Sequence, residues 1–237
     1  MDTNDIEETS PPPTWFGYSD PAGLTEEGKQ LLRHLADAAR QGAWGEVFSV
    51  LDRNPDLVNV SRPGGRSAFT PLHQAAYHGA TPAAQELVRR GAWLALRTTD
   101  GETAAEVAMR RGHRELAALL ALPTRWAVPP ESLRAMEFYL HALIRIRADE
   151  FVSKAGLRLP PVEPLTGMQS PRLWFPIPGM YGGFSLCLLR GGEHAVLQAD
   201  SWCRMASGSE ERHLITARGV QQLDYYSGAS ASNRPSS

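Results

Sequence analysis

The chain is poor in cysteine, and this scarcity excludes two kinds of small scaffold. Its 237 residues include two cysteines, Cys187 and Cys203. A disulfide framework needs several cysteine pairs, and a zinc site needs Cys or His ligands at short spacing. We therefore expect two reduced thiols, no bound metal and no other cofactor. Cys187 lies among apolar residues and is expected to be a small buried side chain.

Long apolar runs and strongly basic stretches are also missing. No apolar run reaches the roughly 18 residues of a membrane span, and no basic segment followed by an apolar one begins the chain. We expect a cytoplasmic protein without a membrane partner. Residues 1–30 carry a net charge of −6, whereas residues 31–122 and 123–237 each carry +2. Neither folded part is basic enough to predict nucleic-acid binding.

The most informative stretch is residues 70–79, which read T-P-L-H-Q-A-A-Y-H-G. Thr70 suits a helix N-cap, and Pro71 suits the first turn, where a backbone N–H has no helical partner. Gly79 can adopt the left-handed conformation that ends a helix. Small side chains between them predict a narrow apolar face that a second helix can approach closely. These side chains are Leu72, Ala75 and Ala76.

With Thr-Pro-Leu-His, Ala-Ala and Gly at these spacings, residues 70–79 resemble an ankyrin repeat. The resemblance implies that Thr70 and His73 bond to each other and to neighbouring loops, which gives His73 a structural role. The pattern returns in part at Thr103 and Gly112, each 33 residues after its equivalent, and this is the period of the family.

Two weaker repeats flank the central one. Gly42 lies 37 residues before Gly79, which indicates a divergent first repeat with a lengthened loop at residues 62–66. The third repeat has Ala104 and Glu106 where the central one has Pro and His. This departure is expected of a terminal repeat, whose outer face lacks a neighbour. About three repeats are therefore expected, close to the minimum that stacks stably.

After residue 170 the helical periodicity changes to extended segments, which predicts an α+β fold. A short α-helical array of ankyrin-like repeats is followed by a long helix, from Glu131 to about Lys154, and then by a small antiparallel sheet. The wide apolar face of the long helix is expected to be covered on more than one side. The strands are expected at residues 172–175, 184–189, 195–202 and 212–216.

The domain organisation follows from these patterns and from composition. The expected parts are a disordered acidic and Pro-rich arm (residues 1–24), the ankyrin-repeat domain (25–122), a connecting helix and Pro-rich loop (123–170), a small β-rich domain (171–226) and a disordered tail (227–237).

Two short segments have more than one interpretation. The aromatic cluster at residues 15–18 either packs back onto its own chain or docks to another protein. The Gly-rich segment at residues 178–183 either shapes a turn beside a closely packed backbone or cradles a phosphate through backbone N–H groups. It matches no nucleotide-binding fingerprint, which favours the turn.

The resemblance implies recognition of another protein through the loop tips and the exposed side of the first helix of each repeat. Aromatic and arginine side chains are common anchors of protein interfaces. An ordinary solvated face is the alternative for each position, and Trp93 is expected to pack between repeats. By register, the candidate partner-binding residues are Arg66, Phe69, Tyr77, His78, Thr99, Asp100, Glu102, Arg110 and Arg111.

No group of residues in the repeats indicates catalysis. In the C-terminal part, His213 has a side chain that titrates near neutrality, and Ser201, Cys203 and Arg204 could lie beside it across the sheet. No third group that would orient such a pair is evident. We therefore assign no catalytic residue and keep these four as candidates only. The alternative is a histidine that is hydrogen-bonded on a sheet face.

The sequence thus predicts a non-enzymatic protein that binds a protein partner, with the partner and the oligomeric state left open. A short array on a compact, bacterial-type chain fits an adaptor, or an immunity protein that neutralises a toxin or effector by steric capture. The alternative is a C-terminal α+β domain that is an enzyme or small-ligand sensor targeted by the repeats. Residues 175–216 resemble a module of uncharacterised bacterial proteins, which implies no activity.

Overall fold

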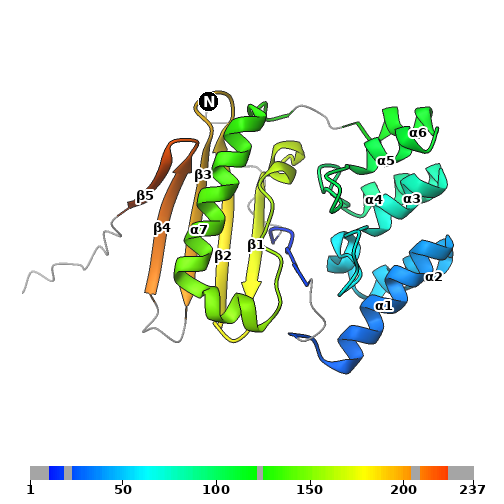
Figure 1. The fold of residues 1–237 in the computed structure, drawn as a ribbon, viewed down its shortest axis with the longest axis horizontal. Helices are drawn as coiled ribbons and strands as arrows, with labels where there is room; N and C mark the ends of the chain where they lie inside the picture. Colours follow the sequence, from blue (N-terminus) through cyan, green and yellow to red (C-terminus); the bar gives the residue numbers. More distant parts are fainter. Residues whose placement is uncertain (1–10, 19–22, 122–124, 204–208, 224–237) are drawn as a thin grey trace, which may run out of the picture.

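The computed structural model describes residues 11–18, 23–121, 125–203 and 209–223. Helical hairpins lie on one side of the molecule, and a sheet with one long helix lies on the other (Figure 1). The helices are α1 (Glu26–Gln41), α2 (Trp44–Arg53), α3 (Pro71–His78), α4 (Thr81–Arg89), α5 (Ala104–Arg110), α6 (Arg114–Leu119) and α7 (Pro130–Lys154). Short 3-10 helices cover Pro55–Asn59 and Glu163–Gly167. The strands are β1 (Arg172–Ile177), β2 (Gly182–Arg190), β3 (Val196–Cys203), β4 (Ser209–Thr216) and β5 (Gly219–Leu223).

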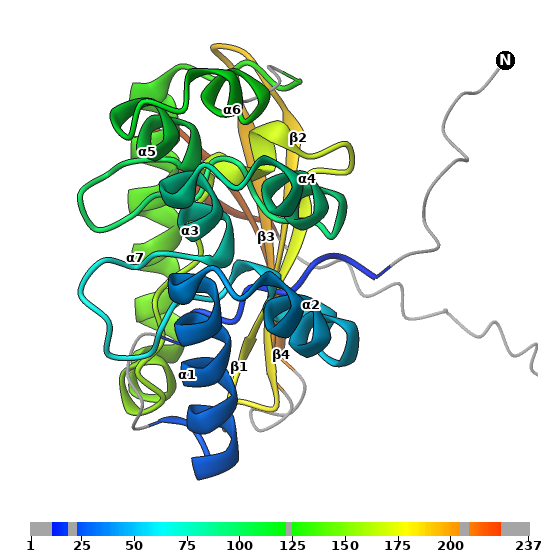
Figure 2. The ribbon, with the colours of Figure 1, turned by 90° about the vertical axis from the view of Figure 1, so that its right-hand side faces the viewer.

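The helices α1 to α6 form hairpins that stack in chain order, with α1 against α3 and α3 against α5 (Figure 2). The first helix of each hairpin has a threonine as its N-cap, and α3 ends at Gly79 with a left-handed φ of 66°. Alanine side chains allow the close approach because they fill little space between helices. Those buried here are Ala38, Ala39, Ala75, Ala76, Ala84 and Ala108.

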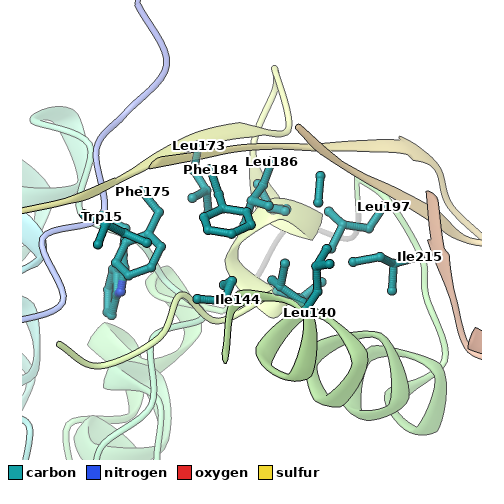
Figure 3. Packing of buried hydrophobic residues seen from close by; sticks show 14 of the residues in the cluster. Trp15, Leu140, Ile144, Leu173, Phe175, Phe184, Leu186, Leu197 and Ile215 are labelled. Atoms are coloured by element: carbon teal, nitrogen blue, oxygen red, sulfur yellow. The ribbon is translucent and has the colours of Figure 1, made fainter. Parts of the chain in front are cut away.

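The five strands form an antiparallel sheet in the order β1-β2-β3-β4-β5. Alternate side chains face α7, as the period of two requires when one face of a sheet is buried. The other face is more exposed, and Cys187 lies on it half-buried, so the expectation of a buried Cys187 is wrong. Figure 3 shows the inward side chains, which include Leu173, Phe175, Phe184, Leu186, Leu197 and Ile215.

This arrangement confirms the α+β prediction of a helical repeat region followed by a sheet domain. The start of β2 also agrees with the structural interpretation of the Gly-rich segment. A Cβ at Gly182 would lie 1.9 Å from the carbonyl oxygen of Trp202, and one at Gly183 would lie 2.1 Å from that of Phe175. These glycines are therefore needed because neighbouring backbones pass too close for a side chain.

Helix α7 covers one face of the sheet with Met136, Leu140 and Ile144 (Figures 1 and 3). Its other side is open, with Phe138 68% and Ile146 84% exposed. The expectation that this helix is covered on more than one side is therefore met only in part: besides the sheet, residues 160–162 bond to Glu137 and His141. Several of its apolar residues lie outside the stripe that a single sheet can bury.

Residues 11–18 are part of the folded structure, which corrects the expectation of a disordered arm over residues 1–24. Trp15 N–H donates to the Trp174 carbonyl at 2.8 Å, and Trp174 N–H donates to the Pro13 carbonyl at 2.9 Å, so the segment lies along β1. The Trp15 indole stacks on Trp93 with ring centroids 5.7 Å apart, and its Nε1–H donates to the Arg158 carbonyl at 2.9 Å.

Trp15 lies between the repeats and the sheet, near Phe175 (Figure 3). Trp93 and Leu96 enter the core of the sheet domain from the repeat side, so Trp93 packs mainly against Trp15 and not between repeats. A paired contact at the same boundary joins Arg97 Nε and an Nη of the same side chain to the Glu163 carboxylate at 2.7 and 2.8 Å. The hairpins keep an apolar core of their own, and Trp93, Leu96 and the Arg97–Glu163 ion pair join them to the core of the sheet domain.

The substitution Trp15→Ala is expected to lower the free energy of unfolding by about 3–5 kcal/mol, the usual cost of truncating a buried tryptophan. It removes the stacking on Trp93 and the hydrogen bond to Arg158. The measurement is urea unfolding followed by circular dichroism. The matched control is Phe138→Ala on the open side of α7, where the expected change is within about 0.5 kcal/mol. Equal effects of the two substitutions would contradict the role given to Trp15.

Candidate protein-binding surface

His73 fixes the base of the candidate surface. Its Nδ1 lies 2.8 Å from Thr70 Oγ1 and accepts from the Thr70 N–H at 3.3 Å. Its Nε2 lies 3.1 Å from the carbonyl oxygen of Leu96, and because a carbonyl only accepts, Nε2 donates. The side chain is 1% exposed, and burial lowers its pKa to about 4. His73 is therefore a neutral link between the start of α3 and the loop before α5, which agrees with its expected structural role.

A row of aromatic rings runs along α3 and reaches the start of α2. We define this aromatic row as Trp44, Phe69, Tyr77 and His78. The ring centroids are 6.5 Å apart for Phe69 and Tyr77, 5.6 Å for Tyr77 and His78, and 6.2 Å for Trp44 and His78. Tyr77 and His78 are exposed, while Phe69 and Trp44 are half-buried. The structure thus brings together three sequence-predicted residues and one that the sequence analysis missed.

Two further contacts hold the aromatic row in place. The Arg111 guanidinium carbon lies 4.3 Å from the centre of the Tyr77 ring, within the range of a cation–π interaction. His78 Nε2 lies 2.9 Å from the carbonyl oxygen of Arg40, to which it donates. The first contact comes from the third hairpin and the second from the first hairpin. The row is therefore supported by helices on both sides of α3.

The loop tips hold the other predicted residues. Thr99 Oγ1 donates to the Arg66 carbonyl, and Thr99 N–H donates to the Ser67 carbonyl at 3.0 Å. Arg110 binds the Glu102 carboxylate with two bonds of 2.7 and 2.9 Å, and this pair lowers the pKa of Glu102. Thr99, Glu102 and Arg110 are thus engaged within the fold. The Asp100 side chain is exposed at the tip of its loop.

A groove of about 410 Å³ adjoins the aromatic row at Phe69. It lies between α1, the loop at residues 62–69 and α3. Only Arg66 and Phe69 of its lining were predicted, because the lengthened loop hides the register of the first repeat from the sequence. The charged and polar lining residues are Asp37, Arg40, Arg62, Arg66, Ser67 and Gln74.

Residues 69–99, at the centre of this surface, match the family described as Ankyrin repeat. The chain contains an ankyrin repeat. Three larger proteins match part of the chain. E3 ubiquitin-protein ligase Ufd4 of Drosophila melanogaster is 34% identical over 122 residues. Probable E3 ubiquitin-protein ligase XBOS32 of Oryza sativa subsp. japonica is 38% identical over 100 residues, and E3 ubiquitin-protein ligase XBAT33 of Arabidopsis thaliana is 39% identical over 100 residues. They cover 49%, 42% and 42% of this chain, but the chain spans 4%, 19% and 18% of the relatives' lengths.

The ankyrin repeat supports a role in protein interaction. Within the described residues, none of the helices is both long and apolar enough to cross a membrane. The same residues contain no cluster of three or more His, Cys, Asp or Glu side chains that could hold a metal ion.

The catalytic candidates lie apart from the ankyrin repeat, on β3 and β4. In the strand register His213 is opposite Ala199 and Ser201 is opposite Glu211. Cys203 is four residues beyond Ala199, or about 13 Å along the strand, so the structure does not bring Cys203 and His213 together. Cys203 Sγ instead donates to the Met180 carbonyl at 3.4 Å. Arg204 lies outside the described residues.

His213 is buried beside two partly buried charged side chains, Glu211 and Arg147. Its Nε2 lies 3.7 Å from a Glu211 carboxylate oxygen, and Glu211 also forms an ion pair with Arg147 of α7. Burial lowers the pKa of His213, and Glu211 partly offsets that effect. Among the described residues, His213 Nδ1 and Arg147 Nε are buried without a hydrogen-bond partner. Ser201 Oγ donates to the Glu211 carbonyl at 3.4 Å, so it is not directed at His213.

His73 predicts a dependence of stability on pH. The unfolded chain binds a proton at His73 below about pH 6.5, whereas the folded chain does so only below about pH 4, so acid favours unfolding between these values. His73→Gln is expected to remove up to about 1.4 kcal/mol per pH unit from the slope of unfolding free energy in this window. Urea unfolding at several pH values measures it.

The control for this experiment is Leu72→Ala, because Leu72 is 1% exposed and does not titrate. It should destabilise the chain and keep the wild-type slope. A wild-type slope in the His73→Gln variant would show that the pH dependence comes from other groups.

Proposed function

We propose that this chain is a non-enzymatic protein-binding protein, and that its aromatic row and adjoining groove are the binding surface. The observation that carries the proposal is the set of contacts around Tyr77: exposed aromatic side chains are held by Phe69 and His78, and Arg111 stacks on the Tyr77 ring. Tyr and Arg are enriched among the residues that dominate interface energies.

Preorganisation supports this choice of surface. Binding normally costs about 0.5–1.5 kcal/mol for each flexible side chain that becomes ordered. Tyr77 is packed between two rings and a guanidinium, and the His78 ring is hydrogen-bonded to the Arg40 carbonyl. Much of this ordering is thus already present in the free chain. A solvated face with no binding role does not require such contacts.

The link between the repeats and the sheet supports an adaptor, or an immunity protein that covers a toxin or effector by steric capture. Trp15, Trp93 and Leu96 belong to the core of the sheet domain, so a partner on the repeats is held at a fixed position relative to the sheet. Steric capture depends on such bulk beside the contact surface, and an adaptor can present the sheet at a defined position. The immunity role, the bacterial source and the cytoplasmic location stay predictions.

A ligand-sensing or enzymatic C-terminal domain is the second candidate. It is favoured by the buried nitrogen atoms of His213 and Arg147, for which the described residues offer no hydrogen-bond partner. Because the proposed surface is on the repeats, we expect the His213→Gln variant to capture the partner as the wild type does. Loss of a separate activity or of ligand binding in that variant, with capture intact, would favour the second candidate.

The experiment that tests the proposal is affinity capture from native lysate with the immobilised full-length chain, followed by affinity measurement on the purified partner. Tyr77→Ala and Arg111→Gln are each expected to weaken binding about tenfold or more, which corresponds to about 1.4 kcal/mol or more. Arg111 is exposed, so Arg111→Gln should change the unfolding free energy little, whereas Tyr77→Ala also removes ring contacts, and urea unfolding of each variant is therefore measured beside its affinity.

The matched controls are Phe138→Ala on α7 and Arg114→Gln on α6, which replace exposed residues of the same types outside the aromatic row. They should bind as the wild type does. Unchanged binding by both Tyr77→Ala and Arg111→Gln would remove the aromatic row from the interface.

A further inference from the structure

The groove beside the aromatic row has an unbalanced set of charges. Three arginines, Arg40, Arg62 and Arg66, and one carboxylate, Asp37, line it. Asp37 forms an ion pair with Arg62, so these two charges compensate each other. Arg40 and Arg66 are exposed, and neither forms an ion pair with any of the described residues.

The position of Arg40 changes this balance only in part. Arg40 is in the last turn of α1, where the helix dipole places about half a negative charge. Arg66 is in the loop and has no such compensation; its carbonyl accepts from Thr99 while its side chain stays exposed. The groove therefore keeps a net positive charge of more than one unit beside an apolar wall.

The positive charge continues onto the aromatic row. Phe69 lines the groove and also contacts Tyr77. Arg111 stacks on the Tyr77 ring and has no ion pair among the described residues. A guanidinium stacked on a ring keeps its N–H edge free to bind a carboxylate with two bonds. Arg40, Arg66 and Arg111 thus form a series of available cations along an aromatic surface.

We infer that the partner presents an acidic segment, with Asp or Glu side chains on both sides of an apolar or aromatic residue, to this groove and row. The inference rests on the proposed function and names the chemical class of the partner. Nucleic acid fits less well, because the chain as a whole has a net charge of −2 and neither folded part is strongly basic. Proteins that bind nucleic acid neutralise a run of phosphates with many Lys and Arg side chains, whereas this surface offers Arg40, Arg66 and Arg111.

The test is selection of peptides from an unbiased random display library on the immobilised full-length chain. Selected peptides are expected to carry net negative charge and at least one aromatic or large apolar residue. Their binding is expected to weaken at least tenfold in the double variant Arg40→Glu/Arg66→Glu. Binding should also fall as NaCl rises from about 50 to 300 mM, because salt screens exposed charges. The matched control is Arg53→Glu/Arg114→Glu, on α2 and α6, which should bind as the wild type does.

The outcomes separate this inference from the proposed function. The inference would be overturned if the selected peptides were neutral or basic, bound Tyr77→Ala more weakly than the wild type, and bound Arg40→Glu/Arg66→Glu as the wild type does. This result would leave the proposed surface intact. Equal competition by a single-stranded oligomer of about 20 thymidines would also overturn it, since it would indicate a general polyanion site. A library that yields no binder sensitive to either variant would overturn both.

Discussion

The arrangement of the candidate surface depends on one buried imidazole. His73 accepts from the N-terminus of α3 and donates to the Leu96 carbonyl, with almost no contact with water. Both ring nitrogens are therefore used, and loss of either bond would leave a buried polar group unsatisfied. The bond to Leu96 sets the position of the loop before α5, from which Thr99 reaches the Arg66 carbonyl. The place of the loop tips is thus a consequence of a neutral histidine inside the central hairpin.

A second constraint joins the repeats to the sheet. The short segment around Trp15 bonds to β1 through its backbone and stacks on Trp93 through its side chain. Short repeat arrays gain stability from neighbours on each side, and here the sheet domain is an additional neighbour. The Arg97–Glu163 contact at the same boundary adds an ion pair that is only partly exposed. The binding surface is consequently presented by a larger body than the hairpins alone.

The sequence allowed prediction of those features that depend on local chemistry. The caps at Thr70 and Gly79 and the spacing of 33 residues identified the hairpins, and alternation of apolar residues identified the first four strands. The short strand β5, with one partner and three exposed residues, has too weak a pattern to be detected. Packing of the cluster at residues 15–18 onto its own chain was one interpretation of the sequence, but the place of Trp15 could not be predicted, since its partner Arg158 is 143 residues away. Trp44 and Arg40 could not be assigned to the candidate surface for the same reason, because their contacts with His78 depend on how one hairpin packs against the next.

The central claim is that the aromatic row contacts the partner, and hydroxyl-radical footprinting of the full-length chain with and without the purified partner tests it most directly. Aromatic side chains react readily when exposed, so each ring reports its own burial. The account predicts that Tyr77, Phe69 and Trp44 lose reactivity in the complex, while Trp174 and Trp202 on the open face of the sheet do not change. Protection of Trp174 and Trp202, with Tyr77 as reactive as in the free chain, would contradict it.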